Sequence, residues 1–298
     1  MYKKMVVLLD GSDLAEVVFE YAQELSGRVH LDLELLHVCD PKESDELPMR
    51  RGYIERMAHE LCERAEAVRA KYRSQPTETC IQASGHVVVG SPAEEILKYI
   101  DENDIDLVMM STHGSSGDKD WDLGDVANKV IHASRVPIWL VPTELREDII
   151  DDTLPGRSMV VPLSGTKQSG SAIPHAVYLM KQRAGSGEII LLHVMEPGYI
   201  HVSRAALEAA DEKREQMKTY LEGVANEIRE AGLKVRTEVL TGEPADGIIN
   251  YLKRNPAQLL VMATRGHGRL SRMVFGSVTE SVIHLVKKTP LLLVSGED

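Results

Sequence analysis

The chain has 298 residues, a length that corresponds to about two domains. Hydrophobic residues make up 43% and charged residues 27% of it, which is ordinary for a globular protein, and the formal net charge is −12. This acidity argues against nucleic-acid binding, because phosphates repel an acidic protein. No apolar run approaches the roughly 18–20 residues that a membrane helix needs, and the first apolar run ends at Asp10, too early for a signal peptide. We therefore expect a cytoplasmic protein without membrane contacts.

The acidity is concentrated in one half of the chain. Residues 1–150 hold 16 Lys and Arg against 29 Asp and Glu, a net charge of −13. Residues 151–298 hold 18 basic and 17 acidic residues, a net charge of +1. An anionic ligand is therefore expected to prefer the second half.

The cysteines do not form a recognisable motif. Cys39, Cys62 and Cys80 are an odd number without paired spacing. Neither a zinc site nor a disulfide framework is predicted, and free thiols in a reducing compartment are expected.

In the first half, apolar runs that alternate with helical patterns predict five strands, at 5–9, 31–38, 79–89, 105–110 and 137–141. Helices are predicted at 14–25, 52–72, from 92 onward and at 124–133, with a polar loop at 42–52. Ser91 is the expected N-cap of the third helix, with Pro92 at its first position. An acidic connector at 142–156 follows, and it divides the chain into predicted domains at 1–146 and 155–298.

The second half repeats the first. Gly11, His37, Gly90 and Gly114 have counterparts 154, 156, 152 and 152 residues later, at Gly165, His193, Gly242 and Gly266. A nearly constant offset predicts a duplicated domain. Because strands alternate with helices in each copy, the fold class is α/β, with two tandem doubly wound parallel sheets of the Rossmann-like kind.

Ligands of such sheets bind at the carboxyl ends of the strands, where the strand order reverses. Asp10 and Ser164 end the predicted first strands of the two halves, and Ser111 and Ala263 end the fourth strands. If the first and fourth strands are neighbours, these residues line one site in each domain.

The segment 261–277 has the pattern of an anion site. A buried strand at 259–262 precedes a loop with two glycines and three arginines, and Gly276-Ser277 opens a helix at 278–288. Backbone N–H groups at such a helix start favour a phosphate. An alternative is that Ser277 and Glu280 form only a capping box.

The corresponding segment 109–125 keeps the frame but changes the chemistry. Asp125, which would cap a helix equally well, replaces Ser277, and residues 115–123 contain three aspartates where residues 267–275 contain Arg269 and Arg272. Each arginine alone is equally well explained as a solvated surface charge. A carboxylate at contact distance repels phosphate by at least about 1 kcal/mol, so we expect phosphate binding mainly in the second half.

These motifs resemble the universal stress protein family in its tandem two-domain form, over essentially the whole chain. Its nucleotide-binding members carry Gly-x-x-Gly, nine residues and then Gly-Ser or Gly-Thr. Residues 263–277 fit this frame with Ala263 in the first position, whereas residues 111–125 lose the first Gly and the final hydroxyl. The family's Asp after the first strand is Asp10 here, but Ser164 in the second half, which weakens that site.

The resemblance implies a cytoplasmic stress-response regulator that binds ATP or another adenine nucleotide, with its associated Mg²⁺, mainly in domain 2. The implied cofactor-binding residues are Pro162, Ser164, Val194, Met262, Ala263, Gly266, His267, Gly268, Arg269, Gly276, Ser277 and Val278. An internal pseudo-dimer through the last strands, 137–141 and 290–294, a homodimer and unidentified protein partners are also expected. The alternatives are an interaction scaffold with vestigial pockets and a weak ATP hydrolase.

Two further features have simpler explanations. His37 and His193 occupy equivalent positions, but neither has a partner at metal-ligand spacing, which favours a structural role. We find no P-loop, no aspartate pair for Mg²⁺ and no Ser-His-Asp arrangement, so no catalytic or metal-binding residue is predicted. The long charged helix at 203–231 is expected to cover the sheet rather than to face a partner.

Overall fold

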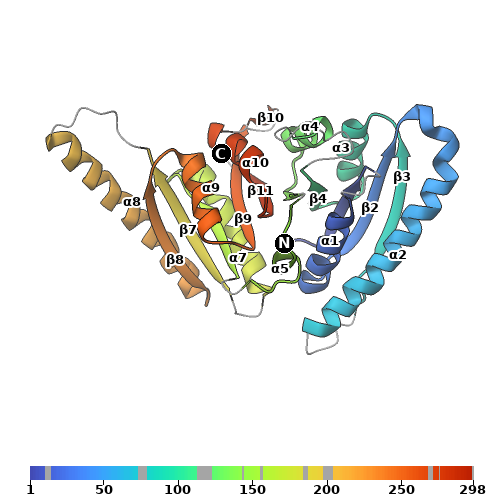
Figure 1. The fold of residues 1–298 in the computed structure, drawn as a ribbon, viewed down its shortest axis with the longest axis horizontal. Coiled ribbons are helices and arrows are strands. Elements are labelled where there is room, and N and C mark those ends of the chain that lie inside the picture. Colours follow the sequence, from blue (N-terminus) through green and yellow to red (C-terminus); the bar gives the residue numbers. More distant parts are fainter. Residues whose placement is uncertain are drawn as a thin grey trace. The chain divides into compact units, whose positions relative to one another are not determined.

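The computed structural model of the protein describes residues 1–10, 15–72, 79–112, 123–142, 144–154, 157–183, 187–196, 204–267, 271–274 and 276–296. The chain forms two compact units, unit 1 at Met1–Asp151 and unit 2 at Asp152–Asp298. The division falls within the acidic connector at 142–156. Figure 1 labels the elements of both units.

Unit 1 alternates strands and helices along the chain. Its elements are β1 (Lys4–Leu9), α1 (Ala15–Val29), β2 (Asp32–Cys39), the 3-10 helix η1 (Pro41–Glu46), α2 (Leu47–Tyr72), β3 (Ala83–Val89), α3 (Pro92–Glu102), β4 (Leu107–Ser111), α4 (Asp125–Ala133), β5 (Ile138–Val141) and the short α5 (Glu147–Ile150).

Unit 2 repeats this alternation. Its elements are β6 (Ser158–Pro162), α6 (Lys167–Gly170), α7 (Ala172–Lys181), β7 (Glu188–Met195), α8 (Arg204–Glu230), β8 (Lys234–Thr241), α9 (Pro244–Arg254), β9 (Leu259–His267), β10 (Ser271–Val274), α10 (Ser277–Leu285) and β11 (Leu291–Ser295). Strand β10 pairs antiparallel with β9, and the equivalent segment of unit 1 lies outside the described residues.

The sheets are doubly wound, as the sequence predicts. The strand order is β3-β2-β1-β4-β5 in unit 1 and β8-β7-β6-β9-β11 in unit 2, and these neighbours pair in parallel. The first and fourth strands are therefore neighbours in each unit, with Val7 opposite Met109 and Val160 opposite Leu260. The strand order reverses at these pairs, which places a crevice at their carboxyl ends.

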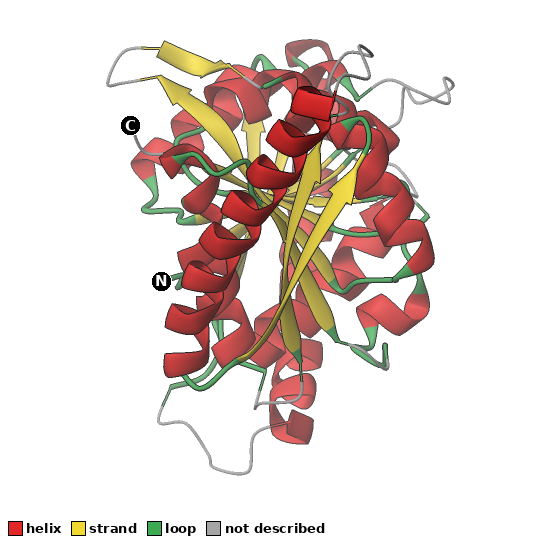
Figure 2. Ribbon diagram, turned by 90° about the vertical axis from the view of Figure 1, so that its left-hand side faces the viewer, coloured by secondary structure: helices red, strands yellow, loops and turns green. Residues whose placement is uncertain are grey.

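The central strands are buried on both faces, which explains their nearly continuous apolar sequences. Met5, Val6 and Val7 of β1 are all 0% exposed, as are Met159, Val160 and Val161 of β6. In unit 1, α1 packs against α2 and α3 packs against α4, and in unit 2 α9 packs against α10. Figure 2 shows strands in yellow between red helices.

Two predicted boundaries in unit 1 are wrong. Helix α2 begins at Leu47 rather than near residue 52, because η1 and the first turn of α2 occupy the segment expected to be a polar loop. Strand β3 begins at Ala83 rather than Thr79. The backbone at residues 79–81 bonds to side chains of α2 instead: Arg69 donates to the Thr79 oxygen, and the Ile81 N–H donates to Glu66.

The predicted loop after residue 262 is also partly wrong. Strand β9 continues to His267, and β10 returns antiparallel, with Ser271 opposite His267 and Val274 opposite Arg265. The long charged helix is present as α8. Its side chains from 208 to 220 are mostly exposed, whereas Leu221, Ala225 and Ile228 are buried, so its second half covers the sheet.

Within the described ranges, no helix is both long and apolar enough to cross a membrane.

Candidate functional site

Five of the predicted site residues of unit 2 lie level with the carboxyl end of β6 on three neighbouring strands. Pro162 is the last residue of β6, and Ser164 follows two residues later. Val194 is the second-last residue of β7, and Met262 and Ala263 are in β9. Strand β6 pairs with both β7 and β9, so the sheet brings these positions to one edge. Met262 is 4% and Val194 9% exposed, whereas Ser164 is exposed.

Ser164 belongs to a compact turn of hydroxyl groups. Its Oγ lies 2.9 Å from Oγ1 of Thr166, and its N–H donates to Oγ of Ser169 over 3.1 Å. Thr166 caps α6 by accepting from the Ser169 N–H at 3.2 Å. Gly165 has φ +85, a left-handed conformation that favours glycine. The turn offers uncharged hydroxyls where unit 1 offers the carboxylate of Asp10.

The start of α10 faces the same edge of the sheet. Because α10 connects the parallel strands β9 and β11, it must begin at the carboxyl end of β9. Gly276 is its N-cap, with φ −71 and ψ 149, and Ser277 is its first helical residue and exposed. Gly276 has no side chain that could cap the helix, so the first N–H groups of α10 and the positive end of its dipole favour an anion at this edge.

The capping predictions are therefore wrong in their details. Ser277 is not the N-cap, so it cannot form a capping box with Glu280, and in unit 1 the N-cap of α4 is Gly124 rather than Asp125. Ser91 is the N-cap of α3, but its side chain makes no capping hydrogen bond. The two helices after the fourth strands thus begin alike, on glycine, and differ at the next residue, Ser277 or Asp125.

The rest of the predicted phosphate segment is only partly described. The backbone of Gly266 and His267 belongs to β9, and Val278 is half-buried in the first turn of α10. Gly268 and Arg269 lie outside the described residues, as does the acidic segment 113–122 of unit 1. Arg272 lies in β10.

A contact that sequence reasoning missed lies beside Val194. A Cβ added to Gly247 of α9 would be 2.7 Å from Cγ1 of Val194, so the helix backbone approaches the end of β7 closely. In unit 1 the equivalent residue is Glu95, whose side chain covers Gly90; a Cβ at Gly90 would be 2.6 Å from Cγ of Glu95. The repeat offset of 152 aligns Gly247 with Glu95 and could have revealed this difference.

The two equivalent histidines support the ends of the first strands. His37 Nδ1 donates to the Leu9 oxygen at 3.0 Å, and His193 Nδ1 donates to the Leu163 oxygen at 2.6 Å. Arg50 donates to Nε2 of His37 over 2.7 Å, which requires a neutral ring with its proton on Nδ1. These contacts support the structural role predicted for both residues. The two carbonyl groups belong to the residues that directly precede Asp10 and Ser164.

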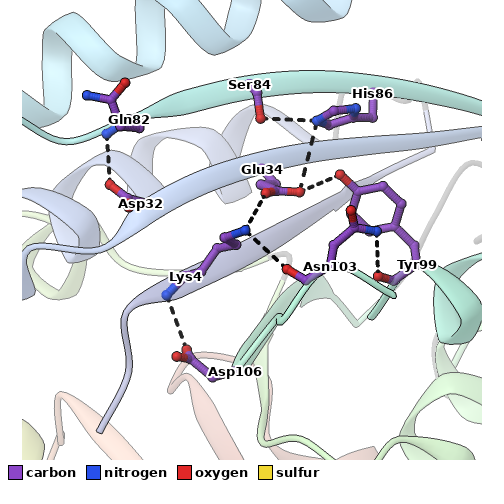
Figure 3. Close-up of polar contacts among 9 residues, drawn as sticks. All are labelled: Lys4, Asp32, Glu34, Gln82, Ser84, His86, Tyr99, Asn103 and Asp106. Carbon is purple, nitrogen blue, oxygen red and sulfur yellow. Dashed lines mark hydrogen bonds and ion pairs between the residues drawn. The ribbon is translucent and has the colours of Figure 1, made fainter. Parts of the chain in front are cut away.

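A polar cluster in unit 1 lies at the other end of the strands (Figure 3). Glu34 of β2 accepts a hydrogen bond from the Tyr99 hydroxyl and pairs with Lys4 at 3.1 Å. His86 of β3 lies 3.1 Å from Oγ of Ser84 and 4.0 Å from Glu34. Burial and the adjacent Glu34 raise the pKa of Tyr99. The cluster joins three strands to α3, and its members already satisfy one another, which indicates a structural role.

Within the ranges that the structure covers, no group of three or more His, Cys, Asp and Glu side chains is placed to hold a metal ion.

Comparison with known proteins identifies the same family domain in both halves of the chain. The model of the "Universal stress protein family" matches residues 1–142 and 156–295. The universal stress protein Slr1230 of Synechocystis is 22% identical over 94% of this chain and 96% of its own, and YxiE of Bacillus subtilis is 26% identical over 47% of this chain and 99% of its own.

A solved structure shares the fold of both units. The universal stress protein from Archaeoglobus fulgidus superposes with a TM-score of 0.70 at 22% identity, covering 98% of both chains. The family match thus spans both units and repeats the duplication that the sequence predicts. The chain belongs to the universal stress protein family, in its tandem two-domain form.

Proposed function

We propose that unit 2 binds ATP or another adenine nucleotide, with its phosphates at the start of α10 and its nucleoside at the carboxyl ends of β6, β7 and β9. The observation that carries the proposal is the start of α10 on Gly276 and Ser277, whose N–H groups stand at the positive end of the helix dipole without an acidic residue at the N-cap or the first position. In unit 1 the same turn begins Gly124-Asp125.

The electrostatic difference between these turns sets the expected preference. Asp125 is exposed at the first helical position of α4, where its negative charge interacts favourably with the helix dipole and repels an anionic ligand. Ser277 leaves that place uncharged and adds a hydroxyl donor. Unit 2 therefore binds the nucleotide and unit 1 does not.

The proposal assigns binding and no catalysis. It includes the Mg²⁺ that accompanies the nucleotide phosphates. The protein would act in the cytoplasmic stress response, and its nucleotide state would select protein partners, including a second copy of the chain.

Titration with ATP tests the proposal. The Gly276→Asp/Ser277→Asp double variant adds two carboxylates near the phosphates, each costing about 1 kcal/mol or more, and so should weaken binding by about thirtyfold or more. The matched control is Gly124→Asp, which adds an acid to the equivalent position of unit 1 and should leave the affinity unchanged.

Two results would contradict it. No saturable binding of ATP by the unmodified protein at millimolar concentration would favour the interaction scaffold. Equal weakening by Gly124→Asp would move the site to unit 1. Release of phosphate above a no-protein control, lost in the double variant, would add hydrolysis to binding.

A further inference from the structure

Two of the three cysteines lie close together in unit 1, away from the crevice. Cys62 is a half-buried residue of α2, and Cys80 is exposed in the segment 79–82 that leads into β3. The thiol of Cys62 donates to the backbone oxygen of Ile81 over 3.1 Å. Since Ile81 follows Cys80 directly, one thiol already contacts the residue next to the other.

Helix α2 holds this segment along one face. Residues 62, 66 and 69 are spaced so that they share a side of the helix. Arg69 donates to the Thr79 oxygen over 2.7 Å, and the Ile81 N–H donates to Glu66 over 2.6 Å. Cys80 therefore lies between two residues that are fixed to the face carrying Cys62, and the fold keeps the two cysteines together.

The surroundings give the two thiols different reactivity. Burial is the main cause that raises the pKa of Cys62, and the negative charges of Glu66 and of a Cys80 thiolate raise it further. Cys62 is thus kept as a thiol, whereas the exposed Cys80 is open to reagents in solution. An oxidant would meet Cys80 first, because the thiolate is the nucleophile and its access decides the rate.

We propose that Cys62 and Cys80 form a reversible oxidation site, in which hydrogen peroxide converts the two thiols to an intramolecular disulfide. The Cys80 thiolate attacks one peroxide oxygen, the O–O bond breaks, and Cys80 becomes a sulfenic acid as hydroxide leaves. Cys62 then loses its proton to solvent and attacks the Cys80 sulfur, and the sulfenic oxygen leaves as water. In sum, two thiols and one peroxide give one disulfide and two waters.

The bond would tie α2 covalently to the start of β3 and close the loop between them. That loop joins two neighbouring elements of unit 1, so oxidation would act on unit 1 and leave the crevice of unit 2 unchanged. The proposal is independent of nucleotide binding. Cys39 serves as an internal control, because it is 1% exposed at the end of β2.

Peptide mapping after peroxide treatment tests the site in the full chain. Trypsin releases the three cysteines in separate peptides, with Cys62 in 57–64, Cys80 in 74–98 and Cys39 in 29–42. After peroxide treatment, alkylation of remaining thiols and digestion without reductant, we expect peptide 57–64 joined to 74–98, and separated again by dithiothreitol. This product should exceed any link to Cys39 by at least about tenfold, since proximity raises the effective concentration of the partner thiol.

Variants and a denatured sample supply the controls. Cys39→Ser should leave the link intact, and Cys80→Ser should abolish it. In guanidinium chloride the preference for the 62–80 pair should disappear, because it depends on the fold. The proposal is overturned if Cys80 oxidises to the sulfinic acid in the native protein without the link, or if links to Cys39 form equally fast.

Discussion

Unit 1 and unit 2 start the helix after their fourth strand in the same way, on Gly124 and on Gly276, and place opposite chemistry one residue later. The same contrast holds after the first strand, where unit 1 has Asp10 and unit 2 has Ser164. Within one chain, therefore, the same backbone frame presents acids in one copy and hydroxyls in the other. The net charges of the halves, −13 and +1, extend this contrast beyond the crevice.

The fold of each unit and the chemistry of its crevice therefore depend on different residues. Strand order and the strand-end histidines are the same in both units, because they depend on apolar burial and on backbone hydrogen bonds. The crevice residues that differ between the units, Asp10 and Ser164, and Asp125 and Ser277, are exposed and contribute little to that packing, so they could diverge without loss of the fold.

The largest expected difference concerns how each unit holds its end of the connector. In unit 2 Arg183 pairs with Asp152, and the two side chains are only 9% and 5% exposed. In unit 1 Arg28 donates to the backbone oxygen of Asp151 over 2.8 Å. Arg183→Ala removes the positive charge paired with the buried carboxylate of Asp152 and should cost unit 2 up to about 3–5 kcal/mol. Arg28→Ala removes the bond to Asp151 and the pair with Glu24 at 2.8 Å, and should cost unit 1 less because Glu24, 14% exposed, stays more accessible to water than Asp152 at 5%.

Urea unfolding with two probes separates these effects. Both tryptophans, Trp121 and Trp139, belong to unit 1, so tryptophan fluorescence follows that unit, whereas hydrogen exchange read by mass spectrometry follows each unit. Arg183→Ala should accelerate exchange in unit 2 and leave the fluorescence transition nearly unchanged. An equal shift of both signals would mean that the units unfold together.

A smaller difference is expected between two equivalent tyrosines. The Tyr99 hydroxyl donates to Glu34, which is partly buried, so Tyr99→Phe deprives a carboxylate of its donor and should cost unit 1 about 1–3 kcal/mol. Burial raises the pKa of Tyr251, which the nearby charge of Arg236 lowers only in part, and the buried hydroxyl forms no hydrogen bond of normal geometry with any described residue. Tyr251→Phe should change stability by less than about 0.5 kcal/mol. Equal losses of stability in the two variants would show that both hydroxyls form hydrogen bonds.

The pH dependence of unit 1 checks the same contact. Burial and Glu34 raise the pKa of Tyr99 in the folded state above the ordinary value of about 10. The folded state then holds the proton more tightly than the unfolded state, so this contribution is present below pH 10 and is lost as pH rises further. The fluorescence midpoint in urea should fall less steeply above pH 10 in Tyr99→Phe than in the unmodified protein.

Sequence patterns predicted most of the fold because apolar runs and the repeat offset report burial directly. They predicted the doubly wound parallel sheets, but not the extension of β9 through Arg265 and His267, because that pairing depends on a partner strand and not on apolar periodicity. The N-caps moved by one residue for a similar reason, since glycine, serine and aspartate all suit a helix start. The approach of Gly247 to Val194 depends on how α9 packs, which local sequence does not determine.

That approach gives the smallest predicted effect. Alanine is preferred over glycine in a helix by about 1 kcal/mol, so Gly223→Ala in α8, where a Cβ meets nothing within 4 Å, should stabilise unit 2 by roughly 0.5–1 kcal/mol. At Gly247 the added Cβ would be 2.7 Å from Val194 Cγ1, and overpacking of about 1–3 kcal/mol should cancel or exceed the same gain. Hydrogen exchange of unit 2 measures both variants. If Gly247→Ala stabilises as much as Gly223→Ala, then α9 moves away from β7 without cost, and Val194 is not held against the helix as the structure indicates.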